Sequence, residues 1–312
     1  MMLGVDVAKD NLVASDPHGK PRTIANSKDA VAELLSSLDP GATIAMEATG
    51  NYHKLLANAA FSRGFRVIVF NPRDVLHYAK SISPRAKTDQ VDAKVIARYA
   101  LARPDHLPYE PKSEIAQKLL DLGRVRSSLV RKRTSLENEL RECPELSEYL
   151  EPAIDCLCKS VAKIDKDLSA VAAKSSEHAL MTGTPGVGTL VGAYTLGLLM
   201  SGVFERSDSF VGFTGLDVKI RQSGKKLGNA CISKRGDPEI RRLLFLAART
   251  AANQPGPFRE LYLRYQTNGL SKTAATVAVA RKIARTLWAI YTKKTPYHAD
   301  RVLNQTARVH DC

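Results

Sequence analysis

The chain has 312 residues, of which 46 are Lys or Arg and 32 are Asp or Glu, so its formal net charge is +14. Hydrophobic residues make up 44% and charged residues 25%, which excludes a disordered or membrane-embedded chain and leaves room for about two domains. The positive excess is spread along the whole chain rather than gathered in a tail. This pattern favours a folded protein that binds a polyanion, most simply nucleic acid.

The cysteines and the apolar segments indicate in which cellular compartment the protein is located. The five cysteines are odd in number and lack the Cys-x-x-Cys spacing of zinc sites, so we expect free thiols. The N-terminus has no basic stretch followed by an apolar run. The longest apolar tract, 189–203, has about 15 residues, whereas a membrane span needs about 20. The sequence therefore predicts a cytoplasmic protein that does not enter a membrane.

Residues 1–108 predict an α/β domain. Apolar alternation and turn residues predict strands at 3–7, 11–15, 23–25, 43–47 and 65–70. Helices are expected at 30–38, 55–60, 73–79 and 88–102. Three antiparallel strands followed by alternating helices and strands is the order of an RNase H-like (RuvC-like) nuclease fold.

Four carboxylates occur at suggestive places in this domain. Asp6 projects from the strand face opposite to the apolar one, and Glu47 ends the strand expected beside it. Asp89 and Asp92 lie at i and i+3 of a helix, with side-chain roots about 5–6 Å apart. Together the four could hold two Mg²⁺ ions on either side of a scissile phosphate. The alternative is that the helical pair are solvated acids favoured by the helix dipole.

Residues 113–176 predict two long helices broken at Cys143-Pro144. The second helix carries a sustained apolar seam at Leu150, Ile154, Leu157, Val161, Ile164, Leu168 and Val171. An antiparallel coiled-coil hairpin is the minimal interpretation, and pairing between protomers is the alternative. The basic residues of the first helix face either solvent or phosphate.

Residues 180–295 predict a mostly helical domain. The turn Thr184-Pro185-Gly186-Val187-Gly188 resembles a helix-hairpin-helix element, whose backbone N–H groups can hold a DNA phosphate without reading sequence. Ser233 lies beside Lys234 and Arg235, just before a helix that Asp237 would cap. A serine that attacks phosphate needs such cations, although a serine in a polar loop is also a common turn residue. The tail 296–312 is polar and expected to be poorly ordered.

Three N-terminal segments resemble the motifs of the DEDD-type insertion-sequence transposases, a family that also includes the Piv-type DNA invertases. These segments are Gly4–Lys9, Met46–Tyr52 and Lys87–Ala93. The C-terminal half is similar as well, in Pro185–Gly188, Phe213–Leu216, Ser223–Gly224 and Ile232–Asp237, the last before an Arg-Arg-Leu-Leu helix. The resemblance spans about residues 3–295 in the family's order.

The resemblance implies a RuvC-like catalytic domain, a coiled-coil hairpin and a C-terminal transposase domain. It implies that Asp6, Glu47, Asp89 and Asp92 hold two Mg²⁺ ions, for which Mn²⁺ can substitute. It further implies that Ser233 attacks the phosphodiester and forms a covalent phosphoserine–DNA intermediate. The implied partners are double-stranded donor and target DNA, a structured bridge RNA, and further copies of the chain in a dimer or dimer of dimers, where one subunit's carboxylates meet another's serine.

Nucleic acid is expected to contact the cations and turn glycines around these motifs. They are Lys9, Lys87, Arg124, Arg126, Arg131, Gly186, Gly188, Lys225, Lys226, Lys234, Arg235, Arg241 and Arg242.

Three other functions are compatible with the sequence. A RuvC-like structure-selective endonuclease would hydrolyse DNA with metal-activated water and would not need Ser233. A Piv-like invertase would share the serine chemistry and differ in its substrates. A non-catalytic basic nucleic-acid-binding protein would use the acids only structurally. The sequence leaves open the DNA sites and the group that deprotonates Ser233, which could be a DEDD acid, a metal-bound hydroxide or bulk water.

Overall fold

The computed structural model describes the backbone of residues 1–82, 89–219, 222–223, 226–227 and 231–304, and the side chains of 1–82, 92–219 and 231–303. The chain divides into two compact units, Met1–Pro111 and Lys112–Cys312.

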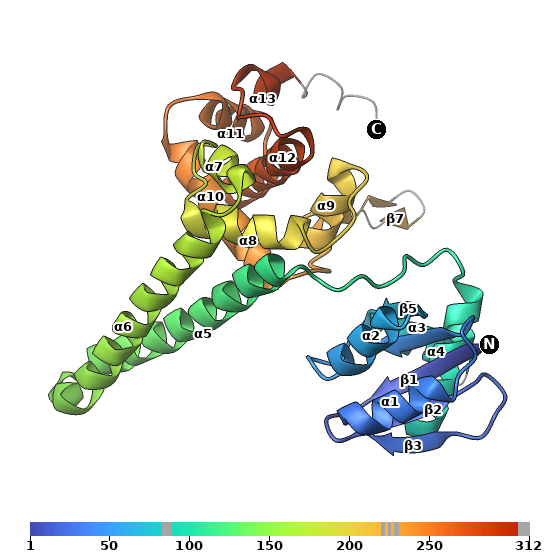
Figure 1. Cartoon of the computed structure of the whole chain (residues 1–312). Coiled ribbons are helices and arrows are strands. Elements are labelled where there is room, and N and C mark those ends of the chain that lie inside the picture. Colours follow the sequence, from blue (N-terminus) through green and yellow to red (C-terminus); the bar gives the residue numbers. More distant parts are fainter. Residues whose placement is uncertain (83–88, 220–221, 224–225, 228–230, 305–312) are drawn as a thin grey trace. The chain divides into compact units, whose positions relative to one another are not determined.

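The first unit is built on a five-stranded mixed sheet of order β3-β2-β1-β4-β5 (Figure 1). The strands are β1 (Met2–Val7), β2 (Asn11–Ser15), β3 (Arg22–Ala25), β4 (Thr43–Glu47) and β5 (Arg66–Phe70). β1, β2 and β3 pair antiparallel, whereas β1, β4 and β5 pair parallel. The helices are α1 (Lys28–Ser36), α2 (His53–Ser62), α3 (Pro72–Ile82) and α4 (Asp89–Ala102). The predicted RNase H-like α/β order and the central place of β1 are confirmed.

Helices cover both faces of this sheet. On one face, Val5 of β1 and Ile44 of β4 pack with Leu34 of α1 and Leu56 of α2. On the other face, residues of β4 and β5 pack with α3 and α4 through a cluster of Ala45, Ile68, Phe70, Val75, Val95, Ile96 and Ala100. Because side chains alternate along a strand, Gly4 and Asp6 point away from the Val5 face and toward the side of α4.

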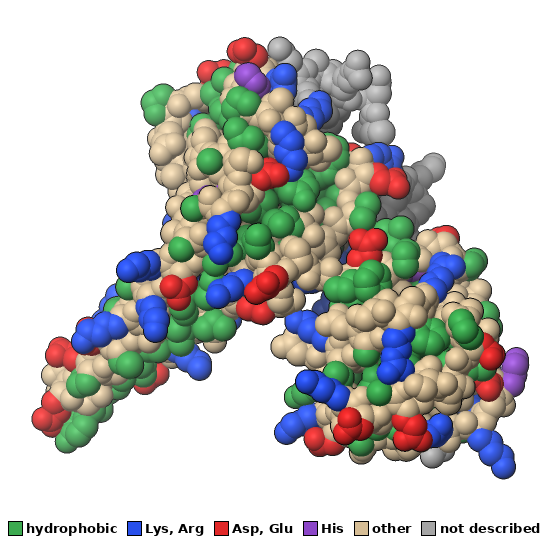
Figure 2. Space-filling view, viewed as in Figure 1, with side chains coloured by type: hydrophobic (Ala, Val, Ile, Leu, Met, Phe, Trp, Pro, Cys, Tyr) green, Lys and Arg blue, Asp and Glu red, His purple; other side chains and the backbone are tan. Residues whose placement is uncertain are grey.

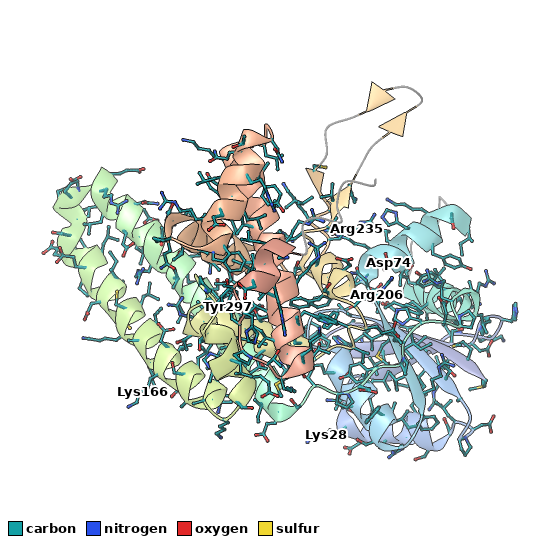
Figure 3. The ribbon with its side chains drawn as sticks, turned by 90° about the horizontal axis from the view of Figure 1, so that it is seen from above. Lys28, Asp74, Lys166, Arg206, Arg235 and Tyr297 are labelled. Atoms are coloured by element: carbon teal, nitrogen blue, oxygen red, sulfur yellow. The ribbon has the colours of Figure 1, made fainter. Side chains whose placement is uncertain are left out.

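The second unit begins with a long antiparallel helical hairpin. It consists of α5 (Glu114–Glu142), the short 3₁₀ turn η1 (Pro144–Leu146) and α6 (Ser147–Ala172). Every member of the predicted seam on α6 is partly or fully buried, and Val161 and Leu168 are the most buried of them. The seam therefore pairs within one chain, as the minimal interpretation expected. Figure 2 shows Lys and Arg side chains along the hairpin, mixed with acidic ones, and in Figure 3 Lys166 points away from it.

The rest of the second unit packs around a single apolar core. Its helices are α7 (Ser176–Thr182), α8 (Thr189–Leu199), α9 (Ser207–Thr214), α10 (Pro238–Asn253), α11 (Pro257–Thr267), α12 (Lys272–Lys293) and α13 (Asp300–Asn304). Nine of the residues of α8 are buried, from Val191 to Leu199, which confirms the predicted buried helix. Among the helices in the described ranges, none is long and apolar enough to cross a membrane.

Four very short strands lie between α9 and α10. They are β6 (Val218–Lys219), β7 (Gln222–Ser223), β8 (Lys226–Leu227) and β9 (Cys231–Ile232). β6 pairs with β9 and β7 pairs with β8, both antiparallel, so the described residues form two separate two-stranded pairs. The β6–β9 pair is called the ribbon below. Ser233 directly follows β9 and Asp217 directly precedes β6, at the end of the ribbon that we call its foot.

The tail after Pro296 was expected to be poorly ordered, and this expectation is wrong as far as Asn304. The ring of Tyr297 stacks on Phe258 at 5.9 Å between centroids, and Val302 of α13 is 1% exposed. These two apolar contacts, together with a 3.4 Å hydrogen bond from Lys282 Nζ of α12 to Arg301 O, hold the segment against α11 and α12. The four described cysteines, Cys143, Cys156, Cys158 and Cys231, are free thiols as predicted, and Cys312 lies outside the described residues.

Candidate active site

Asp6 and Glu47 lie at the carboxyl ends of two neighbouring parallel strands, Asp6 next to the last residue of β1 and Glu47 as the last residue of β4. The register pairs Val5 with Met46, so the next residue on β1 is Asp6 and the next on β4 is Glu47. Both side chains are partly buried, and Glu47 Oε1 accepts a 3.3 Å hydrogen bond from Thr49 Oγ1. The carboxyl ends of parallel strands are where α/β proteins place their sites, because the chain turns away there and leaves a crevice.

Helix α4 lies directly against β1 because Gly4 has no side chain. A Cβ on Gly4 would lie 2.2 Å from the carbonyl oxygen of Ala93 and 2.5 Å from the amide nitrogen of Ala97. Asp92, which is partly buried, immediately precedes Ala93, and Asp89 lies one helical turn before it. The glycine thus brings the acidic first turn of α4 to the strand that carries Asp6.

The donor set of this site consists of carboxylate oxygens, which are the ligands that Mg²⁺ prefers. Among the described side chains, no three acidic, His or Cys residues are grouped closely enough to hold a metal ion. The side chain of Asp89 lies outside the described residues. The neighbouring positions of Asp6 and Glu47 agree with the sequence prediction, whereas the complete four-carboxylate metal site stays a prediction.

Ser233 directly follows the ribbon strand β9, and the ribbon fixes its backbone. Its N–H donates a 2.8 Å hydrogen bond to the carbonyl oxygen of Asp217, the residue that precedes β6. Its Oγ donates a short hydrogen bond to Asp217 Oδ1 and accepts one of 3.2 Å from the N–H of Arg235. The serine hydroxyl is therefore held in place by a carboxylate on one side and a backbone amide on the other.

The residue after Ser233 has a strained backbone. Lys234 adopts φ of +54°, a left-handed conformation that is uncommon for residues other than glycine. Its N–H donates a 3.1 Å hydrogen bond to the carbonyl oxygen of Gly215, which helps to hold this conformation. Such strain costs of order 1–3 kcal/mol and is concentrated at functional sites. The side chains of Lys234 and Arg235 are both exposed, and Arg235 is labelled in Figure 3.

The loop then passes tightly over the end of α9 into α10. A Cβ on Gly236 would lie 2.1 Å from the carbonyl oxygen of Phe213, so no side chain fits there. Asp237 caps α10 by accepting a 2.8 Å hydrogen bond from the N–H of Glu239, and Pro238 takes the first helical position. The predicted N-cap is confirmed.

An open groove of about 650 Å³ lies beside this cap, between α5 and α10. Its charged lining consists of Arg124, Arg131, Asp237, Glu239 and Arg242. Burial raises the pKa of the Glu239 carboxyl, but the hydrogen bonds from Arg242 and Ser127 and the charges of Arg242 and Arg131 together hold this pKa below its ordinary value. The three arginines exceed the two acids, so the groove suits an anionic ligand.

The other predicted nucleic-acid contacts fall in different settings. Arg126 is bound across the hairpin to Asp165, with 3.0 Å between Nη2 and Oδ2, and so has a structural role. Gly186 packs against α10, where a Cβ would lie 2.2 Å from Ala247 O, whereas the N-cap Gly188 faces open space. Arg241 Nη1 donates a 3.2 Å bond to Thr214 O. Lys9 is exposed, and the side chains of Lys87, Lys225 and Lys226 lie outside the described residues.

Sequence reasoning missed Asp217 and Tyr194. Tyr194 is completely buried in α8, and its hydroxyl donates a 2.7 Å hydrogen bond to Asp237 Oδ2. The sequence does contain a signal for Asp217. This acidic residue directly follows the Phe213–Leu216 motif and interrupts an apolar run. Tyr194 offers no such signal, since a tyrosine in an apolar helix is typical of a core.

Comparison with known proteins agrees with this architecture. Residues 3–148 match the family model of a transposase of the DEDD IS110 type, and residues 178–263 match that of the transposase IS116/IS110/IS902 family. The first match contains β1, β4 and α4, and the second contains Ser233 and the ribbon.

Individual relatives align along most of their length. The chain is 26% identical over 336 residues to the transposase for insertion sequence element IS1328 of Yersinia enterocolitica, covering 95% of this chain and 98% of that protein. It is 27% identical over 338 residues to the transposase for IS1111A of Coxiella burnetii, with coverages of 95% and 91%. It is also 27% identical over 267 residues to the pilin gene-inverting protein of Moraxella bovis, with coverages of 81% and 80%. The chain therefore belongs to the IS110/IS116 family of DEDD transposases, enzymes that bind DNA and cleave and transfer its strands.

Proposed function

We propose that this transposase cuts and rejoins DNA through Ser233, with Asp6, Glu47, Asp89 and Asp92 holding two Mg²⁺ or Mn²⁺ ions. The attack would leave a covalent phosphoserine–DNA intermediate. The observation that carries the proposal is the setting of Ser233, whose hydroxyl is hydrogen-bonded to a carboxylate and followed directly by two exposed cations.

The residues around Ser233 suit phosphoryl transfer. The transition state places negative charge on the oxygens of the attacked phosphate. Lys234 and Arg235 directly follow Ser233 in the sequence, and their positive charges can pair with these oxygens. The left-handed backbone conformation of Lys234 sets the direction in which its side chain leaves the backbone. The serine is thereby oriented before DNA binds, which lowers the entropic cost of attack.

The carboxylates of the first unit would act on the same phosphate. Asp6 and Glu47 lie near the carboxyl ends of adjacent strands, and Asp92 lies in the first half of α4. All three supply hard oxygen donors. Bound there, divalent ions supply Lewis-acid stabilisation of the phosphate and of the leaving oxygen. The carboxylates and Ser233 belong to different units of the chain, so either one chain or two could supply them. In line with the family resemblance, we propose that the active enzyme is a dimer or dimer of dimers in which they come from different subunits.

Donor and target DNA and a structured bridge RNA are the proposed nucleic-acid partners. The net charge of +14 and the arginine-lined groove beside α10 support the binding of more than one polyanion. The relative from Moraxella bovis is named for inverting a pilin gene, and this favours site-specific inversion as the second candidate. Inversion would use the same proposed residues on differently arranged DNA.

A covalent-trapping assay tests the proposal. Protein, Mg²⁺, RNA transcribed from the element and a plasmid carrying the element with its flanking DNA are incubated, denatured and separated by gel. We expect a protein–DNA adduct that is absent in Ser233→Ala and in Asp92→Asn. The control Ser209→Ala, on the exposed side of α9, should form the adduct as the unaltered protein does. Cleavage that persists in Ser233→Ala without any adduct would instead identify a hydrolytic RuvC-like nuclease.

A further inference from the structure

Asp217 and Ser233 lie opposite each other at the foot of the ribbon. Strand pairing matches Val218 with Ile232, so Asp217 and Ser233 are the next residues outward on the two strands. Two hydrogen bonds join them, from Ser233 N–H to Asp217 O and from Ser233 Oγ to Asp217 Oδ1. The backbone bond fixes the distance between the strands, which leaves the two side chains in contact.

We propose that Asp217 is the general base that takes the proton from the Ser233 hydroxyl during DNA cleavage. The inference rests on the proposed role of Ser233 as nucleophile and adds the group that activates it. A catalytic base must lie within hydrogen-bonding reach of the proton that it removes, and Asp217 Oδ1 already accepts that proton in the hydrogen bond. Because Asp217 and Ser233 belong to the same unit of the chain, Asp217 can remove this proton whichever subunit supplies the metal-binding acids.

Ser233 Oγ forms a bond to phosphorus while the bond between phosphorus and the departing deoxyribose oxygen breaks. The hydroxyl proton passes to Asp217, and the departing oxygen takes a proton from water, which regains one from Asp217. In rejoining, the free DNA hydroxyl attacks the phosphoserine while the bond between phosphorus and Ser233 Oγ breaks. The proton of the attacking hydroxyl is lost to water, water passes a proton to Asp217, and Asp217 gives it to Ser233 Oγ.

Cations and other titratable groups surround this pair. Arg281 of α12 is largely buried, and its Nε has no hydrogen-bond acceptor among the described residues. Burial and the neighbouring charge of Arg285 lower the pKa of the Arg281 guanidinium, and the nearby Tyr265, Asp208 and Asp217 oppose this only in part. The other such groups on the neighbouring described segments are Lys219, Cys231, Lys234, Arg235, Arg241, Tyr265 and Arg285.

Asp217→Asn separates proton transfer from positioning. The asparagine carbonyl can still accept the hydrogen bond from Ser233 Oγ, so the geometry of the foot should persist, but an amide cannot take up the proton. We expect the rate of covalent adduct formation at neutral pH to fall by about 10²- to 10⁴-fold, the usual contribution of a general base. Above neutral pH the rate of Asp217→Asn should rise about tenfold per pH unit, because hydroxide replaces the base, while the rate of the unaltered protein stays level.

Two further variants complete the test. Asp217→Glu keeps a carboxylate and should form adduct at least about tenfold faster than Asp217→Asn at neutral pH. Asp208→Asn removes a carboxylate near Arg281 that does not contact Ser233 and instead pairs with Arg285. Asp208→Asn should react like the unaltered protein, which would show that the loss of one negative charge near Arg281 does not explain the effect.

The outcomes distinguish this inference from the proposed function. All assays use conditions in which the unaltered protein cleaves the plasmid. Adduct formation by Asp217→Asn within about threefold of the unaltered rate would overturn the inference and leave serine catalysis intact. A loss that alkaline pH does not recover, with Asp217→Glu equally inactive, would also overturn it, because only positioning would then be affected. Cleavage without an adduct in the unaltered protein would overturn the proposed function itself.

Discussion

Tyr194 Oη and Asp237 Oδ2 are joined by a 2.7 Å hydrogen bond that ties the buried helix α8 to the N-cap of α10. Burial raises the pKa of the Tyr194 phenol, and the carboxylate of Asp237 raises it further, so the hydroxyl stays protonated and continues to donate. Gly123 of α5 makes room for the ring, since a Cβ there would lie 2.4 Å from Tyr194 Cδ2. The segment that carries Ser233 is therefore anchored to the interior of the second unit at its α10 end.

Tyr194→Phe should destabilise the second unit. The variant keeps the ring but leaves one oxygen of a partly buried carboxylate without its phenolic donor, which costs about 1–3 kcal/mol. We expect a lower denaturation midpoint in urea, together with slower adduct formation because the α10 cap is less firmly held. Tyr149→Phe on α6 is the control, since Tyr149 is 70% exposed and its loss of a hydroxyl should leave the midpoint unchanged. Equal urea denaturation midpoints for Tyr194→Phe and Tyr149→Phe would show that the hydrogen bond from Tyr194 to Asp237 does not stabilise the second unit.

Gly4→Ala should damage the first unit selectively. The new Cβ would lie 2.2 Å from the backbone of Ala93, so α4 must move off β1 and carry Asp92 away from Asp6. Overpacking of this kind costs about 1–3 kcal/mol, and we expect strand cleavage to fall even where the protein stays folded. Gly41→Ala is the matched control, because nothing lies within 4 Å of a Cβ at that position. Cleavage by Gly4→Ala at the rate of Gly41→Ala would show that close packing of α4 is not needed.

The sequence predicted those elements in which the hydrophobic pattern repeats over enough residues to be recognised. Alternation along 3–7 placed Asp6 opposite the apolar face, and the structure agrees. The four-and-three spacing on α6 predicted the buried seam, and the apolar run of α8 predicted a core helix. In each case the local pattern and the tertiary burial have the same cause, namely one apolar face that must be covered.

The parts that could not be predicted depend on contacts between distant residues. Asp217 and Ser233 meet because β6 and β9 pair, yet each strand has only two residues, too few to show alternation. The partner of Arg126 depends on the register of the hairpin, which sets Asp165 opposite it. Tyr297 and Val302 pack against the core although the composition of the tail is polar, and Lys282 Nζ donates a hydrogen bond to Arg301 O. These contacts depend on distant residues, which the local composition does not show.

An ion pair between Glu177 of α7 and Lys294 makes stability depend on acid pH. The hydrogen bond from Lys294, with a second from Ser175, lowers the pKa of the Glu177 carboxyl from 4.5 to about 2. Since the folded pKa is depressed, the stabilisation is complete above about pH 4.5 and is lost as pH falls toward 2. Lys294 is 54% exposed, so solvent screening limits the effect to about 1 kcal/mol.

Glu177→Gln should therefore flatten the pH dependence of stability. Urea midpoints measured at pH 6 and pH 3 should differ less in the variant than in the unaltered protein, because glutamine cannot titrate. Glu205→Gln, at an exposed position before α9, controls for the general loss of an acid. If Glu177→Gln and Glu205→Gln change the pH dependence equally, the ion pair does not supply it.

Two arginines on the same helix should respond differently to substitution because their partners differ. The side chain of Arg131 is 68% exposed and reaches the groove beside α10, where it lies 3.8 Å from Glu239 and donates a 3.3 Å hydrogen bond to Ser127 Oγ. Arg126 is 21% exposed and bound to Asp165. If the groove holds DNA phosphate, Arg131→Gln weakens binding to a mixed-sequence duplex and reduces the slope of log affinity against log salt by about 1. Arg126→Gln should instead lower the thermal midpoint and leave that slope unchanged, because its guanidinium already has a carboxylate partner. A reduced salt slope in Arg126→Gln and none in Arg131→Gln would place the phosphate on the other face of α5.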